Sequence, residues 1–260
     1  MSQEGSPEVR GGPGVAAHYN RLAPDFTRHW SYSDTFVDWM TGRLVAHTAI
    51  GADSHLLDVG SGPALYSRRL AEHTRHPVVC VDPSAAMLTH IPDTPRLVPV
   101  HATAQAVARG EAELPHREFD AILVKEALHH VPRGARGPTV RGLASLLAPH
   151  GRLVVVMMPT HDCGHPLFSA ALRKLGQARF TPETVAGMLA DSGRAVHIHQ
   201  DAFPVTMPTA RYLDMVGARY LTLLEHFTDT ELDAGVTEIR RAHPGDTVTF
   251  TDRYTVLVAH

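Results

Sequence analysis

Lysine and asparagine are almost missing from this chain of 260 residues. Of the 24 lysines and arginines only Lys125 and Lys174 are lysines, and Asn20 is the single asparagine. Such a bias, together with abundant alanine, glycine and proline, is typical of a GC-rich genome. The 19 histidines can share that origin, so their number alone does not indicate metal binding or catalysis. A lysine in such a chain indicates that its position requires this side chain, so Lys125 is a candidate functional residue.

Other absences exclude whole classes of protein. Two cysteines form no disulfide framework and fit a reducing compartment, so we expect a cytoplasmic location. No run reaches 18 apolar residues and residues 1–14 hold no apolar signal segment, so we expect no membrane partner and a flexible start. The net charge of −3, without a basic stripe interleaved with aromatics, argues against a nucleic-acid partner.

Short apolar runs alternate with helical patterns along most of the chain. This alternation predicts an α/β fold in which helices cover both faces of a doubly wound, mostly parallel sheet. The length favours one domain with additions over two domains. The predicted strands cover 55–60, 77–82, 96–101, 119–125, 151–158, 195–199 and 247–258. The predicted helices cover 15–23, 35–50, 66–73, 84–90, 103–109, 139–147 and 181–192, the last with Thr181 as its N-cap.

Three additions are expected at the carboxyl ends of the strands, where open parallel sheets bind ligands. They are the helical segment 15–50, the stretch 159–180 and an insertion of about 200–246 before the last strand. We expect segment 15–50 and the insertion to form lids over the domain at 51–260. The alternative is that the insertion only packs against the helices of the sheet.

The insertion also offers candidate substrate contacts. Arg211 and Arg219 lie eight residues apart, so on one helix they would face nearly the same way and could clamp a carboxylate or phosphate. Two solvated arginines are the alternative. Tyr220, which follows directly, is a further candidate substrate contact.

A glycine-rich turn indicates a nucleotide-type cofactor. Gly60 and Gly62 end the first predicted strand and open a helix, and Asp82 ends the next strand twenty residues later. This arrangement is typical of an adenosine-containing cofactor whose ribose hydroxyls bind the acid. A nicotinamide site wants a third glycine where Leu65 stands, and Asp58 would repel a pyrophosphate. The same carboxylate would favour the amino and sulfonium cations of S-adenosylmethionine.

Four motifs in order resemble the class I S-adenosylmethionine-dependent methyltransferases that act on small molecules. They are Leu57-Asp-Val-Gly-Ser-Gly-Pro63, Val79-Cys-Val-Asp-Pro-Ser-Ala-Ala-Met87, the stretch 119–131 and the turn 147–153. The resemblance covers about residues 50–200. It implies a Rossmann-like sheet of seven strands with the last one antiparallel, S-adenosylmethionine as cofactor and S-adenosylhomocysteine as product.

The resemblance also implies a cofactor site. Backbone groups of the turn (Gly60, Ser61 and Gly62) would hold the methionyl part, Asp58 its amino group and Asp82 the ribose. The adenine would lie against Pro83, Met87, Thr103 and Ala104. Separately from the resemblance, Tyr19 in the first predicted helix could close over the cofactor, with ordinary packing as the alternative, and Lys125 is a further candidate for the cofactor pocket. Ala64 replaces a frequent third glycine, which is a small change if its φ is helical.

Candidate catalytic groups follow the fourth strand. His129 is the preferred base or substrate orienter, with His130 as the second candidate. The alternative is that these paired histidines cap a turn. Lys125 could line the cofactor pocket or hold an anionic substrate, and Glu126 could contact the substrate. We expect no metal, because neither His161-Asp-Cys-Gly-His165 nor His197 with His199 offers a convincing ligand set.

These observations predict methyl transfer to oxygen or carbon of a fairly apolar small molecule, in bacterial specialised metabolism. One alternative keeps the fold and uses the bound cofactor in a non-methylating cyclisation or rearrangement. Another is a non-catalytic partner subunit, against which the intact Gly60, Gly62 and Asp82 argue. The sequence leaves the oligomeric state open, with a dimer as one option.

Overall fold

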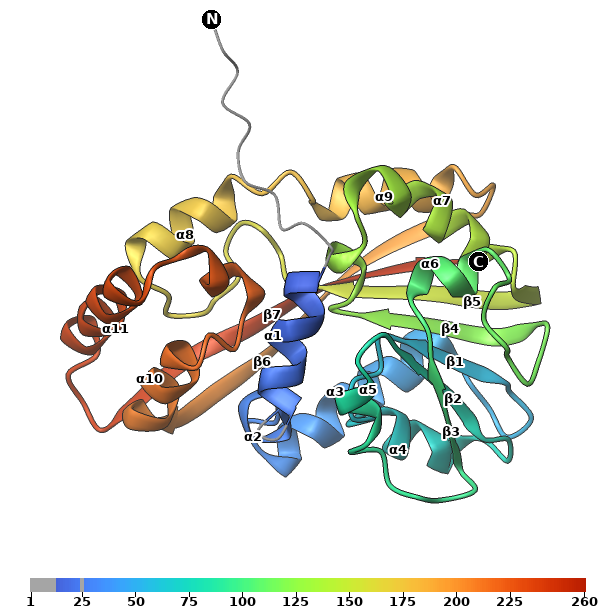
Figure 1. The fold of residues 1–260 in the computed structure, drawn as a ribbon, viewed down its shortest axis with the longest axis horizontal. Coiled ribbons are helices and arrows are strands. Elements are labelled where there is room, and N and C mark those ends of the chain that lie inside the picture. Colours follow the sequence, from blue (N-terminus) through green and yellow to red (C-terminus); the bar gives the residue numbers. More distant parts are fainter. Residues whose placement is uncertain (1–12, 24–25) are drawn as a thin grey trace, which may run out of the picture.

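A computed structural model describes residues 13–23 and 26–260 of the chain, and its centre is one sheet of seven strands (Figure 1). The strands are β1 (Leu56–Val59), β2 (Val78–Asp82), β3 (Leu97–His101), β4 (Phe119–Lys125), β5 (Leu147–Met157), β6 (Val196–Pro208) and β7 (Thr247–Ala259). Their order is β3-β2-β1-β4-β5-β7-β6. Strands β1 to β5 are parallel, and β7 runs antiparallel to both β5 and β6. The predicted fold class and strand arrangement are confirmed.

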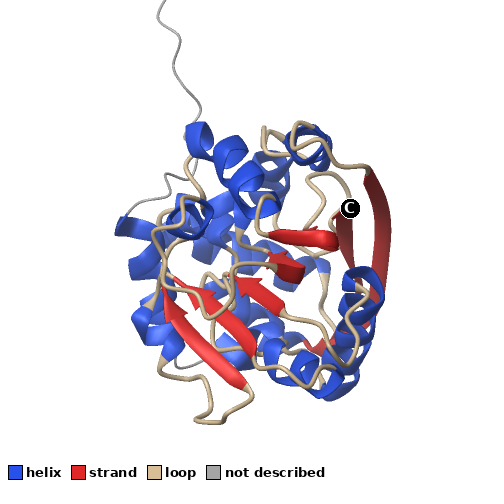
Figure 2. Ribbon diagram, turned by 90° about the vertical axis from the view of Figure 1, so that its right-hand side faces the viewer, coloured by secondary structure: helices blue, strands red, loops and turns tan. Residues whose placement is uncertain are grey.

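Helices lie on both sides of the strands (Figure 2). The α-helices are α1 (Pro13–Leu22), α2 (Phe26–Trp30), α3 (Asp34–Thr48), α4 (Ser67–Leu70), α5 (Ala85–Leu88), α6 (Ala104–Ala108), α7 (Arg133–Ala144), α8 (Ser169–Gly176), α9 (Pro182–Ala190), α10 (Thr209–Gly217) and α11 (Asp229–Ala242). Short 3-10 turns are η2 (Ala71–His73), η3 (Leu128–His130) and η4 (Thr222–His226). Among the described residues, no helix has the length and apolar character needed to cross a bilayer.

The sheet separates two apolar cores. Every residue of β1 and β2 is buried, as expected for central parallel strands. Successive side chains of a strand point to opposite faces, so Leu56 belongs to one core and Leu57 to the other. The first core also holds side chains of α3, α8, α10 and α11, and the second holds those of α7 and α9.

Strands β6 and β7 extend past the rest of the sheet as a two-stranded hairpin. Strand β7 pairs with β5 only over Thr255–Ala259, whereas it pairs with β6 over its whole length. The predicted sixth strand, 195–199, was therefore too short, and the insertion begins at Thr209 rather than at 200. Burial alternates over Val205 and Met207, but the polar Gln200 and Asp201 interrupt the apolar run that the prediction used.

Two further predictions of elements were wrong in their bounds, and two helices were not predicted. Helix α7 covers Arg133–Ala144 and contains Pro138, whereas a helix over 139–147 was predicted. Strand β5 begins at Leu147 instead of 151. Helices α2 and α8 were not predicted, because each is short. The N-cap of α9 is confirmed, since the side chain of Thr181 accepts a hydrogen bond from Thr184 N.

Candidate active site

A cavity of about 420 Å³ lies at the carboxyl ends of β1, β2 and β4. This volume falls within the usual range of small-molecule sites. Its walls come from the turn after β1, the end of β2, residues 103–105 and the segment 125–132 without His129. Helix α1 adds Tyr19, and helix α2 adds Phe26 and Trp30. The predicted cofactor residues line it: Tyr19, Asp58, Gly60, Ser61, Gly62, Asp82, Pro83, Met87, Thr103, Ala104 and Lys125.

The turn after β1 requires glycine. Gly60 has a φ of 80°, and a Cβ atom placed on it would lie 2.3 Å from the Cβ of Ala127. Gly62 has a φ of 54°, also in the left-handed region. Ala64 has a φ of 59°, so the helical φ that would make alanine a small change is not present there. The turn therefore holds Ala64 in a left-handed backbone conformation that glycine would adopt without strain.

Two buried carboxylates flank this turn. Asp82 accepts hydrogen bonds from the backbone N–H of Gly62 (2.9 Å) and of Ser84 (2.8 Å), so each oxygen keeps capacity for another donor. Asp58 accepts a hydrogen bond from the hydroxyl of Ser67. Burial raises the pKa of Asp82, and it raises the pKa of Asp58 to about 6. Both groups would gain from ligand hydroxyls or cations that replace the lost water.

The end of β4 brings opposite charges into the cavity wall. Lys125 Nζ lies 5.0 Å from the ring centroid of Tyr66 and 5.3 Å from that of Tyr254, and burial lowers its pKa. Glu126 has a φ of 51°, which is rare for a residue other than glycine. Its carboxylate takes a hydrogen bond from the backbone of Met158, and burial raises its pKa to about 7.

The two neighbouring histidines differ in their surroundings. His130 lines the cavity, and its Nε2 lies 2.7 Å from the hydroxyl of Tyr19. Burial holds the pKa of His130 well below its ordinary value. His129 is not among the lining residues, and burial lowers its pKa to about 4. Its Nε2 lies 3.5 Å from the hydroxyl of Thr222. The predicted base His129 therefore lies outside the cavity wall, whereas its neighbours Glu126 and His130 lie in it.

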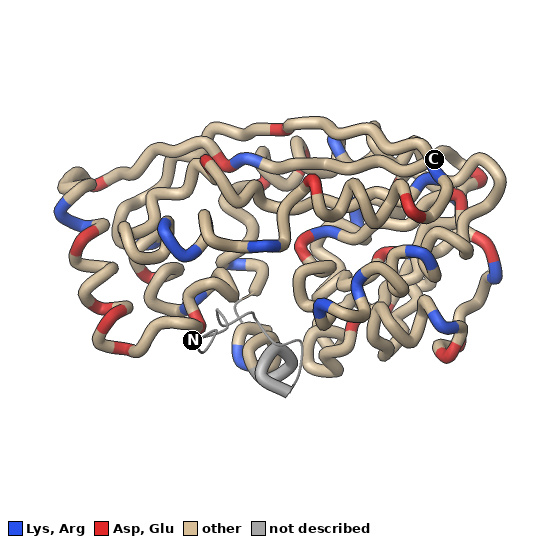
Figure 3. Tube along the Cα trace, turned by 90° about the horizontal axis from the view of Figure 1, so that it is seen from above, with Lys and Arg blue, Asp and Glu red and all other residues tan. Residues whose placement is uncertain are grey.

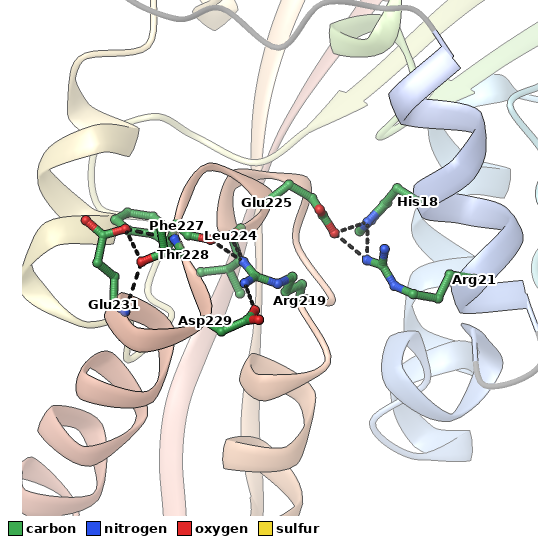
Figure 4. Close-up of polar contacts among 9 residues, drawn as sticks. All are labelled: His18, Arg21, Arg219, Leu224, Glu225, Phe227, Thr228, Asp229 and Glu231. Atoms are coloured by element: carbon green, nitrogen blue, oxygen red, sulfur yellow. Dashed lines mark hydrogen bonds and ion pairs between the residues drawn. The ribbon is translucent and has the colours of Figure 1, made fainter.

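Helix α1 contacts three separate segments of the chain through three consecutive residues. His18 Nδ1 lies 2.6 Å from Glu225 Oε1 of η4, a contact that Arg21 shares (Figure 4). Tyr19 reaches His130 after β4, and Asn20 Oδ1 accepts a 2.7 Å hydrogen bond from the hydroxyl of Ser84 after β2. The single asparagine of the chain thus holds α1 against the cofactor side of the cavity.

The predicted substrate residues of the insertion lie elsewhere. Arg211 donates to the backbone carbonyls of residues 28, 31 and 32. Arg219 donates to two carbonyls of its own segment and to Asp229, as Figure 4 shows. No anion clamp forms, because both guanidinium groups are occupied by these partners. Tyr220 contacts His165 Nδ1 through its hydroxyl at 2.8 Å. None of the three lines the cavity, and neither does any other residue of 200–246.

The aromatic wall of the cavity comes instead from α2, which the sequence analysis missed. Phe26 and Trp30 stack with ring centroids 5.8 Å apart, and both line the cavity. The ring of Trp30 also lies 5.8 Å from that of Tyr220, so the insertion supports this wall from behind. A signal was present: two aromatic residues four positions apart can share one face of a helix.

Four polar atoms of lining residues are buried and have no partner in the described part of the chain. They are Trp30 Nε1, Ser61 Oγ, Glu126 Oε1 and His130 Nδ1. An unpaired buried polar group costs about 1–3 kcal/mol. Such a concentration in one cavity indicates that a polar ligand completes these hydrogen bonds.

Charge is mixed over the molecule. Lys and Arg alternate with Asp and Glu along the trace and form no single basic face in the view of Figure 3. Over residues 13–23 and 26–260, no group of three or more histidines, cysteines or acids has an arrangement that could hold a metal ion. His165, from one of the motifs considered for metal, binds Asp252 through Nε2 at 2.9 Å.

Comparison with known families identifies the class of protein. Residues 56–151 match the family described as "Methyltransferase domain". Residues 56–151 thus form a class I S-adenosylmethionine-dependent methyltransferase domain, which supports an enzyme of the methyltransferase class. The domain implies S-adenosylmethionine as cofactor. The match spans the glycine turn, Asp82 and the end of β4, which together line the cavity.

Solved structures share the fold at low sequence identity. One is a protein from Anabaena variabilis assigned as a methyltransferase of an antibiotic biosynthesis pathway; it is 15% identical, covers 85% of this chain and 96% of its own, and has a TM-score of 0.63. The [4+2]-cyclase SpnF is 16% identical, with coverages of 99% and 98% and a TM-score of 0.63. DhpI in complex with SAH is 16% identical, with 94% of both chains covered and a TM-score of 0.55. No curated protein sequence matched.

Proposed function

We propose that this enzyme transfers a methyl group from S-adenosylmethionine to oxygen or carbon of a small, fairly apolar acceptor. The observation that carries the proposal is the cavity itself, in which a glycine turn and two carboxylates meet an aromatic wall and four unpartnered polar atoms. The fold relatives include the protein assigned to antibiotic biosynthesis, which supports a role in bacterial specialised metabolism.

The lining residues fit the cofactor. Asp82 retains acceptor capacity for two ribose hydroxyls, and Asp58 supplies negative charge near the amino group. Ser61 Oγ lacks a partner and can bind the methionyl part. Met87 and Pro83 would flank the adenine, and Thr103 and Ala104 would contact it from the same cavity wall. When bound, S-adenosylmethionine supplies an electrophilic methyl group on a sulfonium, and methylation of a neutral acceptor releases one proton.

That proton needs an acceptor inside the cavity. Glu126 is suited to this role, because one carboxylate oxygen has no partner and the pKa lies near 7. Lys125 stabilises the carboxylate from the adjacent position, and its charge opposes the burial that raises the Glu126 pKa. His130 is held neutral and orients Tyr19 over the site.

A second candidate is a cyclisation or rearrangement in which the cofactor is retained. The favouring observation is that SpnF, whose printed activity is a [4+2] cyclisation, covers 99% of this chain. Such a pericyclic reaction conserves all protons and leaves no task for a buried, unpartnered carboxylate. Glu126 therefore favours methyl transfer.

The test measures cofactor binding and turnover separately. Isothermal calorimetry with S-adenosylhomocysteine reports whether the cavity binds the product form of the cofactor. Incubation with methyl-labelled S-adenosylmethionine and a set of phenols, enols and amines then reports transfer. The proposal predicts S-adenosylhomocysteine formation in proportion to label on an acceptor. Binding without label transfer, together with conversion of a polyene probe, would establish the cyclase alternative.

A further inference from the structure

The aromatic wall fits a flat molecule. Tyr19, Phe26 and Trp30 form a continuous series, with ring centroids 6.3 Å apart for the first pair and 5.8 Å for the stacked second pair. Each of these residues lines the cavity. Planar conjugated groups pack against such rings in offset or edge arrangements. A flat apolar body is therefore the shape that this wall complements.

The unpartnered atoms near this wall differ in what they need. Trp30 Nε1–H can only donate a hydrogen bond, so it requires an acceptor such as a carbonyl oxygen. An ionised Glu126 can only accept, so its Oε1 requires an O–H or N–H donor. Both requirements come from residues outside the glycine turn and the ribose-binding acid. One ligand that carries a donor and an acceptor would satisfy both.

The charges of the wall favour a neutral ligand. Lys125 and Glu126 are adjacent in sequence and opposite in sign, and both line the cavity. Asp58 and Asp252 add negative charge around Lys125. The ammonium of Lys125 already lies over the ring of Tyr66, with Nζ 5.0 Å from the ring centroid. A cationic acceptor would compete with that ammonium, and an anionic acceptor would meet the carboxylate of Glu126.

From this geometry we propose that the acceptor is a neutral, flat molecule with an ionisable hydroxyl, a phenol or an enol, and a second oxygen that accepts a hydrogen bond. The hydroxyl donates to Glu126 Oε1 and the second oxygen accepts from Trp30 Nε1. On transfer, the new bond joins the acceptor oxygen to the methyl carbon, and the methyl–sulfur bond breaks with its electron pair left on sulfur. The hydroxyl proton passes to Glu126. This proposal rests on the proposed methyl transfer and narrows its substrate class.

Ligand-observed NMR titration in the presence of saturating S-adenosylhomocysteine tests the proposal. The probes are the ortho, meta and para hydroxyacetophenones, acetophenone, phenol and benzylamine. We expect at least one hydroxyacetophenone to bind about three- to tenfold more tightly than both acetophenone and phenol, because two hydrogen bonds replace one. Benzylamine should bind most weakly.

Two variants assign the contacts. Glu126→Gln should weaken the best hydroxyacetophenone by about three- to tenfold and leave acetophenone unchanged. Trp30→Phe should weaken the same probe and acetophenone but leave phenol unchanged. Trp39→Phe is the matched control, because Trp39 packs against Phe203 and does not line the cavity. It should change none of these affinities.

The outcomes separate this proposal from the proposed function. If S-adenosylhomocysteine does not bind, the methyltransferase proposal fails first. If it binds but the hydroxyacetophenones show no advantage, or benzylamine binds best, the acceptor class is overturned while the cofactor assignment stands. A loss of S-adenosylhomocysteine affinity in Trp30→Phe would place Trp30 in the cofactor site and also overturn the proposal.

Discussion

Replacing Glu126 by glutamine should change how the stability of the ligand-free protein depends on pH. Burial raises the pKa of Glu126 from its ordinary 4.5 to about 7, so the folded protein binds the proton more tightly than the unfolded chain. For an acid shifted upward, the stabilising contribution is present at low pH and is lost as pH rises from about 4.5 to about 7. The carboxylate thus penalises the folded state above neutrality.

The size of the effect follows from the shift. About 2.5 pKa units at 1.36 kcal/mol each correspond to roughly 3 kcal/mol in the free energy of unfolding. Most of this change falls between pH 5 and pH 8. We therefore expect Glu126→Gln to gain about 2 to 3 kcal/mol relative to the parent over that interval. Asp58, whose pKa is raised to about 6, contributes a slope of the same sign in both proteins, so it cancels in the difference.

Urea unfolding followed by circular dichroism at pH 5 and pH 8 measures this difference. Glu118→Gln is the control for removing one negative charge, since Glu118 is exposed. The reasoning is refuted if the stabilities of parent and Glu126→Gln run parallel with pH, because the carboxyl group would then titrate alike in the folded and unfolded chains.

Three further predictions concern the cofactor site and its cover. Asp82→Asn should weaken S-adenosylhomocysteine binding by roughly tenfold or more in calorimetry, because a charged acceptor is lost; unchanged affinity would remove Asp82 from the site. Glu225→Gln, which breaks the contact between η4 and α1, should speed S-adenosylhomocysteine dissociation several-fold in stopped flow, whereas Asp229→Asn in the same segment should not; equal rates would contradict a cover role for α1. Gly60→Ala should cost about 2 to 4 kcal/mol in urea unfolding, from a steric clash and an unfavourable φ, whereas Gly42→Ala should not destabilise; equal stabilities would contradict the observed turn.

Much of the cofactor half could be read from the sequence because local patterns determine it. The turn needs Gly60 and Gly62 for its backbone angles, and Asp82 must follow the strand that pairs beside β1. These requirements lie within short segments, so motif spacing captures them. The structure brings all of them to one cavity.

The acceptor half depends on contacts between distant segments, which spacing does not encode. Arg211 looked like a ligand clamp, yet it reaches carbonyls about 180 positions earlier in the chain. His129 and His130 are adjacent in sequence, but the 3-10 turn η3 sends only His130 into the cavity wall. Trp30 lies in a five-residue helix, too short for periodicity to reveal.

The extended hairpin of β6 and β7 allows residues 209–246 to be replaced without changing the cofactor side of the cavity. Residues 209–246 begin and end on neighbouring positions, since Pro208 pairs with Thr247. A segment with such close ends can be exchanged between homologous parents without altering the path of the sheet. Because this segment supports the wall of α2 through Tyr220 and holds α1 through Glu225, its exchange would reshape the acceptor side while Asp58 and Asp82 remain in place. The hairpin is thus a graft point for engineering acceptor choice.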